Sequence, residues 1–499
     1  MRATNPIGRR WLGALTLIAL VAGLLLPLPP LSGQHDHHGH HDDHGSPPQP
    51  HGSDPHQDDA ELHEDEPTPP RPNRRGRGAN RQAPAPAADP KADEEEEPEE
   101  EEDRWLVITG GTIHTVSDGV IADGTILVKN GRIHEIGVDL PTPPDAQVLP
   151  VDGLQVYPGL VAVDSQGLVS SPTDTDPYAF NMQLALAGGV TTARSGNHIL
   201  KLTRGTLEGH ALAGAPFTTI RYTTRDPEGR RNLRGALERI REFRREIRRH
   251  AEKQKENPKL KDLDRKWIRG LFRTAERLID REIVAYAEVS EAGDIREVCA
   301  LAEEFGFDLV LRGAPEAWID AGAVARSGAS VIVTPRQRRD RDDRRNAVSG
   351  GSIQNASILH DHGVCLAIFP VGSLFASGGG VSLSGLAGRD MLNLPLEAAF
   401  AVRGGLSNEA AIRAITLDAA KILRVDHRIG SIEVGKDADF VITDGDLLHY
   451  LTLPQYTIVN GRIAYDQDEA GLLDHIRPGG DPTPQAPKEY WPRKLGEDF

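Results

Sequence analysis

The stretch Ile283-Val-Ala-Tyr-Ala287, followed by Asp308-Leu-Val-Leu311, decides the fold. The first apolar run precedes a helical pattern near 293–305, and the second precedes another near 316–327. Further apolar runs and helical patterns continue the alternation at 331–334, 354–360, 364–369 and 397–403. Strands that alternate with helices indicate a parallel sheet, and this number of units predicts an α/β fold, a (β/α)8 TIM barrel.

β-rich runs with hairpin signals lie on both sides of this region. Short runs between 105 and 136 are broken by Gly110-Gly111 and Asn130-Gly131, and similar turn chemistry returns at 430–465. Glycine and Asn-Gly pairs supply the positive φ angles that tight hairpins need. Between the first β-rich region and the barrel, we expect 156–163 to form one buried strand.

The N-terminus predicts export. Arg9 and Arg10 precede an apolar stretch from Trp11 to Leu26, and Ser32-Gly33 offers a small-residue cleavage site. We therefore expect residues 1–33 to be a secretory signal peptide or a membrane anchor, and the rest to be periplasmic or to face the periplasm.

Residues 34–104 form a linker that is expected to be disordered, because they are rich in histidine, proline and acid. The acidic runs are Glu94–Glu97 and Glu99–Asp103. The histidines either capture zinc, copper or nickel loosely or belong to a solvated linker. The candidate ligands in this tail are His35, His37, His38, His40, His41 and His44.

The charge and the cysteine content argue against two classes of protein, nucleic-acid binders and disulfide-linked frameworks. The net charge of −17 argues against a nucleic-acid partner. Cys299 and Cys365 both lie in apolar runs, so they are expected to be buried small side chains rather than a disulfide framework.

Several motifs resemble the amidohydrolase superfamily, in particular imidazolonepropionases and dihydroorotases. They are Tyr157-Pro-Gly-Leu160, Gly188-Gly-Val-Thr-Thr192, Asp418-Ala-Ala-Lys-Ile-Leu423, Ile429-Gly-Ser-Ile-Glu-Val-Gly-Lys-Asp-Ala-Asp-Phe440 and Val459-Asn-Gly-Arg462. The resemblance implies a barrel over 158–428 in which insertions between strands are tolerated, such as a charged helical insertion at about 221–281. It also implies a small β-sandwich made from 105–157 and 429–470.

The same resemblance implies a divalent metal held by histidines at strand ends. The matching positions are Asp164, Gln166, Tyr286 and Arg312. Asp can bind a metal, but Gln is a poor substitute for imidazole, and Arg has no lone pair to donate. The last barrel strand runs into 370–373, which contains no acid. We therefore expect no cofactor in the barrel, with zinc as the alternative.

An ion pair is predicted in place of the metal. Asp164 and Arg312 would pair across the barrel mouth, with Tyr286 and Arg194 nearby. Such a pocket would favour a small anionic ligand, for example a carboxylate.

Two basic segments stand out. Between Arg221 and Arg281 there are 21 Lys/Arg and 11 Asp/Glu, a local net charge of +10, with apolar residues at helical spacing that predict an amphipathic helix pair. Arg336–Arg345 follows a barrel strand. Both segments are either solvated charged faces or docking sites for anionic partners, including the chain's own acidic segment.

Three alternative hypotheses about function follow from these patterns. The first is an amidohydrolase-like pseudoenzyme, inactive or impaired, that binds a ligand or partner in its barrel. The second is an active metal-dependent hydrolase of C–N bonds in cyclic amides, with non-standard ligands. The third is metal handling by the His-rich tail. The oligomeric state stays open.

Overall fold

The computed structural model describes residues 103–165, 168–169, 171–214, 216–337, 339–344, 348–370 and 393–471. The predicted signal or anchor, the His-rich tail and Gln166 lie outside these residues. No helix in the described ranges combines the length and apolarity needed to cross a membrane.

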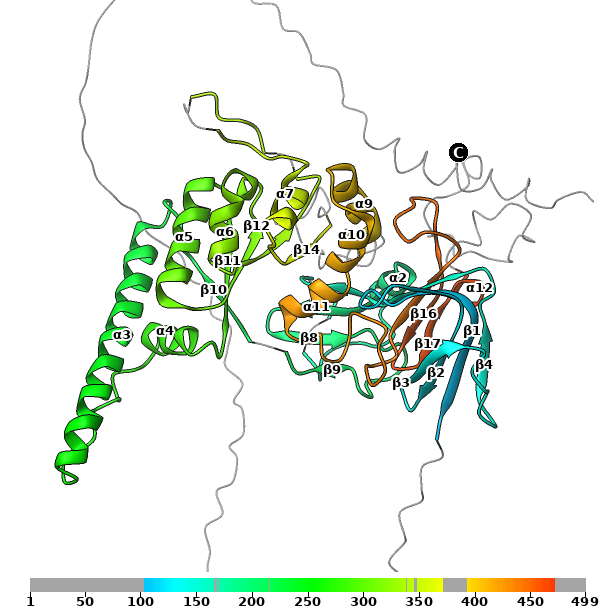
Figure 1. The fold of residues 1–499 in the computed structure, drawn as a ribbon, viewed down its shortest axis with the longest axis horizontal. Coiled ribbons are helices and arrows are strands. Elements are labelled where there is room, and N and C mark those ends of the chain that lie inside the picture. The colour runs from blue at the N-terminus through cyan, green and yellow to red at the C-terminus, as the bar shows by residue number, and fades with distance from the viewer. Residues whose placement is uncertain are drawn as a thin grey trace, which may run out of the picture. The chain divides into compact units, whose positions relative to one another are not determined.

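An eight-stranded sheet joins the two ends of the folded region (Figure 1). Its strands are β1 (Trp105–His114), β2 (Val120–Lys129), β3 (Arg132–Val138), β4 (Gln147–Pro150), β5 (Gln155–Pro158), β15 (Phe440–Thr443), β16 (Pro454–Val459) and β17 (Arg462–Asp466). The order is β17-β16-β15-β5-β1-β2-β3, with β4 beside β1. The two segments of the predicted sandwich meet in this sheet, in which β5 pairs with β1 on one side and with β15 on the other.

The Asn-Gly signal forms the hairpin that it predicts. Asn130 and Gly131 connect β2 to β3, with φ angles of 51° and 81°. A Cβ on Gly131 would lie 2.8 Å from the carbonyl oxygen of Asn460, so glycine also allows the β16–β17 turn to approach.

The prediction of a single strand over 156–163 is wrong. The chain breaks at Pro158-Gly159, which separates β5 in the eight-stranded sheet from β6 (Leu160–Ala162) in another sheet. Proline lacks the N–H of a sheet ladder. A Cβ on Gly159 would lie 2.2 Å from the Thr191 hydroxyl oxygen, so this crossing requires glycine.

The barrel region contains two further sheets among the described residues. One has the order β6-β7-β8-β9, with β7 (Val190–Ser195), β8 (His198–Lys201) and β9 (Ala211–Leu212). The other is parallel and has the order β10-β11-β12-β13-β14, with β10 (Phe217–Ile220), β11 (Val284–Val289), β12 (Leu309–Gly313), β13 (Ser330–Val333) and β14 (Leu366–Ile368).

The two sheets share one buried core. Val161 and Val163, at the β6 end of the first sheet, cluster with Val284 of β11, Val310 of β12 and other strand residues of the second. This is the packing of an α/β fold in which one strand face points inward. Closure of these strands into a complete barrel stays a prediction.

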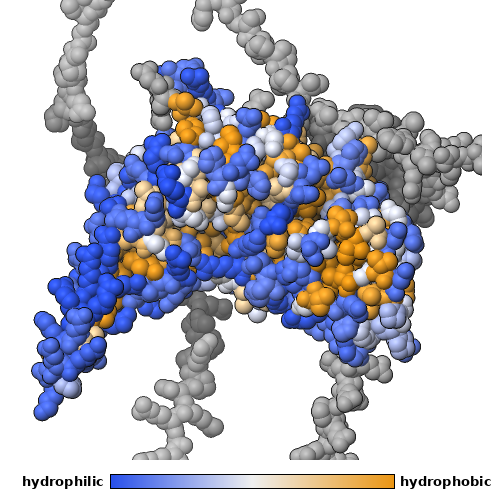
Figure 2. All heavy atoms as spheres, viewed as in Figure 1, coloured by the Kyte–Doolittle hydropathy of each residue, from blue (hydrophilic) through white to orange (hydrophobic). Residues whose placement is uncertain are grey.

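The charged insertion forms a helix pair, as predicted. α3 (Pro227–Glu256) packs on α4 (Leu271–Ile279). Its buried side chains, including Leu237 and Phe243, recur on one face. Asp226 caps its N-terminus by accepting from the Gly229 amide. The remaining α3 surface is hydrophilic (Figure 2).

The other helices lie between or after the strands. They are α2 (Phe180–Ala187), α5 (Ala292–Phe305), η3 (Ala317–Asp320), α6 (Ala321–Arg326), α7 (Asn355–Asp361), α9 (Leu394–Arg403), α10 (Asn408–Ala414), α11 (Leu417–Leu423) and α12 (Gln467–Ala470). The helix expected near 316–327 is thus split into η3 and α6. His360 and Asp361 end α7, and Gly363 follows with a φ of 79°, so the segment 360–362, His-Asp-His, is a helix terminus.

Candidate functional site

Asp164 connects the sheet that contains β6 with the parallel sheet that contains β11 and β12. It follows β6, and its Oδ2 atom accepts a hydrogen bond of 3.0 Å from the Tyr286 hydroxyl on β11. The same oxygen accepts from Arg312 Nε on β12 at 2.9 Å. The Asp164–Arg312 ion pair predicted from the sequence is therefore present.

Arg312 is shared between two carboxylates. Besides Asp164, it contacts Glu288, whose Oε1 lies 3.2 Å from Arg312 Nη1. The parallel register places Glu288 directly opposite Arg312 on the neighbouring strand. The Arg312 side chain is 12% exposed and that of Glu288 is 69% exposed. Arg312 therefore belongs to the buried part of the site and Glu288 to its rim.

Arg194 forms the second cationic wall. Its Nη1 lies 3.8 Å from Asp164 Oδ1 and donates to the Val163 carbonyl at 3.4 Å. Its guanidinium carbon lies 4.3 Å from the ring centroid of Phe217 and 4.8 Å from that of Tyr286. Cations favour the faces of aromatic rings, so these rings hold the guanidinium in place.

Burial and charge shift two titrations at this site. Burial raises the pKa of Tyr286, and the Asp164 carboxylate raises it further, which outweighs the opposing effect of both arginines. For Arg312, burial acts to lower the pKa, but the oxygens of Tyr286, Asp164 and Glu288 outweigh it and the net shift is upward. Tyr286 is therefore a neutral hydrogen-bond donor at neutral pH, and Arg312 is a fixed cation.

These residues do not fit a divalent metal. The Asp164 oxygen nearest to Arg312 is already engaged by a hydroxyl and a guanidinium. The second oxygen faces Arg194. Two permanent cations beside one carboxylate oppose the approach of another cation. No group of three or more His, Cys, Asp or Glu suited to a metal occurs within the described ranges.

The sequence located four of the site's side chains and missed two. Asp164, Tyr286, Arg312 and Arg194 come together, while Gln166 lies outside the described residues. Glu288 was not predicted, although it stands two residues after Tyr286 and alternation places both on one strand face. Phe217 was also missed, because an aromatic residue in a short strand carries no signal that distinguishes a wall of a site from a core.

The basic segment after β13 is a solvated charged face only in part. Arg336 donates from its backbone and its side chain to Glu397, which is fully buried. Arg339 Nε donates to Oε1 of buried Glu316 at 2.7 Å. These two arginines hold the loop by ion pairs with buried carboxylates, so they are not available to an anionic partner. The Arg344 side chain, in contrast, is 93% exposed.

Known proteins with similar sequences belong to the family that the sequence motifs resemble. Residues 329–468 match the amidohydrolase family model. The chain is 40% identical to rat N-acetylglucosamine-6-phosphate deacetylase over 68 residues, and 46% identical to imidazolonepropionase from Bacteroides thetaiotaomicron over 69 residues. Each match covers 14% of the chain and only 15% or 16% of the relative.

A solved structure extends the comparison. An amidohydrolase from Thermotoga maritima is similar, with a TM-score of 0.54 and 21% sequence identity. The similarity covers 72% of this chain and all of that one. The resemblance to the amidohydrolase superfamily is therefore confirmed, together with its mixed α/β fold.

Proposed function

From the resemblance of this chain to the amidohydrolase superfamily, we propose that it is a superfamily protein that binds a small carboxylate at the barrel mouth. Arginine takes the place of the metal that would activate water, so the protein is inactive or impaired as a hydrolase. The observation that carries the proposal is the 2.9 Å contact between Arg312 and Asp164, at positions where the superfamily pattern has metal ligands.

Charge balance supports an anionic ligand. The buried part of the site contains two guanidinium groups and one carboxylate, so its net charge is +1. Glu288 lies at the rim, 3.2 Å from Arg312, and its side chain is 69% exposed, so it offsets this excess only in part. A ligand carboxylate placed beside the arginines would neutralise the excess and could accept two parallel hydrogen bonds from a guanidinium.

An unused donor supports the same ligand. The Nε atom of Arg194 is buried and has no hydrogen-bond partner within the part of the chain that the structure describes. An unsatisfied buried donor costs about 1–3 kcal/mol, and more when it is charged. A ligand oxygen that reaches this atom would remove the cost.

Calorimetric titration tests the proposal with acetate, succinate and N-acetylglycine. Acetamide serves as a neutral compound of nearly the same shape as acetate. We expect the carboxylates to bind and acetamide not to bind. Arg312→Gln should weaken carboxylate binding about tenfold or more, since a charge-assisted hydrogen bond is replaced by a neutral one. Arg344→Gln, at an exposed arginine, is the matched control and should change nothing.

Metal analysis provides the opposite test. The full chain is compared with a variant in which His35, His37, His38, His40, His41 and His44 are replaced by asparagine, so that metal bound by the tail is not attributed to the barrel. One tightly bound ion per chain that survives in the variant, and is lost with Asp164→Asn, would contradict the proposal and favour an active hydrolase. Carboxylate binding that persists after treatment with a chelator would support it.

We also infer that the chain is exported. Arg9 and Arg10 before the apolar stretch that ends at Leu26 support this inference. Fractionation of cells that express the full chain tests it, and recovery in the cytoplasm alone would contradict it.

A further inference from the structure

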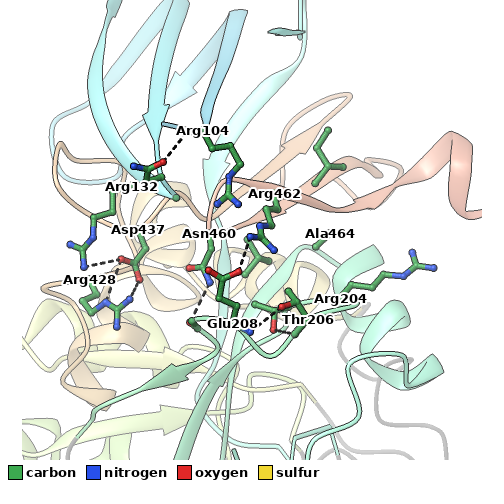
Figure 3. A pocket seen from close by; sticks show the side chains of 16 residues that line it. Arg104, Arg132, Arg204, Thr206, Glu208, Arg428, Asp437, Asn460, Arg462 and Ala464 are labelled. Carbon is green, nitrogen blue, oxygen red and sulfur yellow. Dashed lines mark hydrogen bonds and ion pairs between the residues drawn. The ribbon is translucent and has the colours of Figure 1, made fainter. Parts of the chain in front are cut away.

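An arginine cleft lies on the protein, separate from the barrel mouth. It has a volume of about 190 Å³ and is bordered by the β2–β3 turn, residues 203–209 and the β16–β17 hairpin. Figure 3 shows its charged side chains. They are Arg104, Arg132, Arg204, Arg428, Arg462, Glu208 and Asp437. Five arginines and two carboxylates give this cleft a net charge of +3.

The two carboxylates of the arginine cleft are already paired. Asp437 Oδ2 lies 2.6 Å from Lys201 Nζ and 2.6 Å from Arg428 Nη2. Glu208 Oε2 lies 2.7 Å from Arg462 Nη2. These contacts leave an excess of positive charge for which the cleft itself holds no counterion.

Arg104 and Arg204 carry this excess. Neither guanidinium has a carboxylate within ion-pair distance anywhere in the described ranges. Partial burial lowers the pKa of Arg104, and the adjacent Arg462 guanidinium lowers it further, while Glu208 opposes the shift. Arg104 and Arg462 thus approach each other as like charges (Figure 3). An anion between them would turn a repulsion into two attractions.

An anionic segment of the same chain begins beside the cleft. Residues 94–102 contain eight glutamates and one proline. The next residue, Asp103, accepts a hydrogen bond of 3.0 Å from Asn130 Nδ2 and pairs with Lys129 at 2.6 Å. Asn130 itself borders the cleft. Nine residues reach at most about 30 Å when extended, so this tether keeps the glutamates close to the arginines.

We propose that the arginine cleft binds the chain's own glutamates from 94–102. The linkage is covalent, so the glutamates are present at an effective concentration of roughly millimolar, and weak ion pairs suffice. The contact depends on ionic strength, because exposed ion pairs are screened by salt. It requires no ligand at the barrel mouth and is independent of the proposed function.

The outer part of α3 is the competing surface for the same glutamates. Arg248 and Arg249 are exposed there and have no ion-pair partner among the described residues. However, Asp103 is held at the border of the arginine cleft, so the cleft is the surface that the first glutamates meet. Arg248→Gln/Arg249→Gln therefore serves as the matched control.

Cleavage of the full chain by a glutamate-specific protease tests the proposal. Mass spectrometry gives the rate of cleavage within 94–102 relative to cleavage after Glu64, which serves as an internal reference. In 50 mM salt, Arg104→Gln/Arg204→Gln should raise this ratio about fivefold, the effect of losing two exposed ion pairs. Salt at 500 mM should raise the wild-type ratio similarly, and the α3 control should leave it unchanged.

Two results would overturn the proposal. One is an equal ratio in the wild type and in the cleft variant at 50 mM salt. The other is a rise in the α3 control without a rise in the cleft variant, which would place the glutamates on α3. Both cleft arginines are exposed, and circular dichroism of each variant verifies that the fold is retained.

Discussion

The Asp164–Arg312 pair can be measured by a double-mutant cycle with Arg312→Gln, Asp164→Asn and the combined variant. The side chains are 12% and 15% exposed, and their closest atoms are 2.9 Å apart. In an effective dielectric of about 20, the Coulomb attraction at this distance is about 5–6 kcal/mol, and desolvation offsets much of it. We expect each single change to lower the free energy of unfolding by about 2–4 kcal/mol, because each leaves a partly buried charge without its partner.

The combined variant decides the question. It removes both charges, so it should cost at least about 1.5 kcal/mol less than the sum of the single changes. Urea unfolding followed by tryptophan fluorescence measures all four proteins, with Arg344→Gln as an exposed control whose effect should stay within about 0.5 kcal/mol. A coupling energy below about 0.5 kcal/mol would refute the reasoning, because the two charges would then not interact in solution.

Three further changes are expected to have defined effects. Tyr286→Phe removes the hydroxyl that donates to the site carboxylate, and urea unfolding should show a loss of about 1–2 kcal/mol, whereas an unchanged midpoint would contradict the contact. Burial acts to raise the pKa of Glu316, but hydrogen bonds from two backbone amides and an arginine outweigh it and the pKa lies below its ordinary 4.5. The stability that this carboxylate contributes is therefore present above pH 4.5 and is lost as the pH falls through the lowered value. Glu316→Gln should cost about 2 kcal/mol at pH 7 and progressively less in unfolding experiments below pH 4.5, and a difference that grows in acid would contradict this sign. Lys201→Met removes a fully buried ammonium group that lies 2.6 Å from Asp437 and 2.9 Å from Asp439. Thermal unfolding should show that the free energy of unfolding falls by about 3–5 kcal/mol, because two buried carboxylates lose this cation. A fall below about 1 kcal/mol would contradict the role of the ammonium group.

Local patterns located most of the elements. The alternation of apolar runs and helical spacing gave β11 to β14 and the helices between them, because burial on one face imposes the period of each element. The amphipathic spacing in the insertion likewise gave α3 and α4. The strand expected over 156–163 was wrong because hydrophobicity alone does not show where a run changes sheets. That change depends on the close approach of Thr191 to Gly159, a residue distant in sequence.

The barrel-mouth site was predicted only in part. The superfamily spacing located Asp164, Tyr286 and Arg312 and predicted the pairing of Asp164 with Arg312, since the barrel that the resemblance implies brings its strand ends to one face. It could not show that Glu288 shares Arg312, or that aromatic rings hold Arg194. Those contacts depend on which strands are neighbours and on the rotamers that packing allows.

The sequence by itself determined the α/β class and the amidohydrolase resemblance, and it placed Arg312, a permanent cation, where the resemblance implies a metal ligand. These properties depend on residue types and their spacing, which are the same whatever way the chain packs. Tertiary structure alone decided which charges neutralise one another. Arg336 and Arg339, basic residues in a charged run, form ion pairs with buried carboxylates. Arg104 and Arg204, in contrast, border a cleft in which their charge is not neutralised. The physical reason is that Coulomb attraction depends on distance and burial, and both arise only when segments far apart in the chain meet.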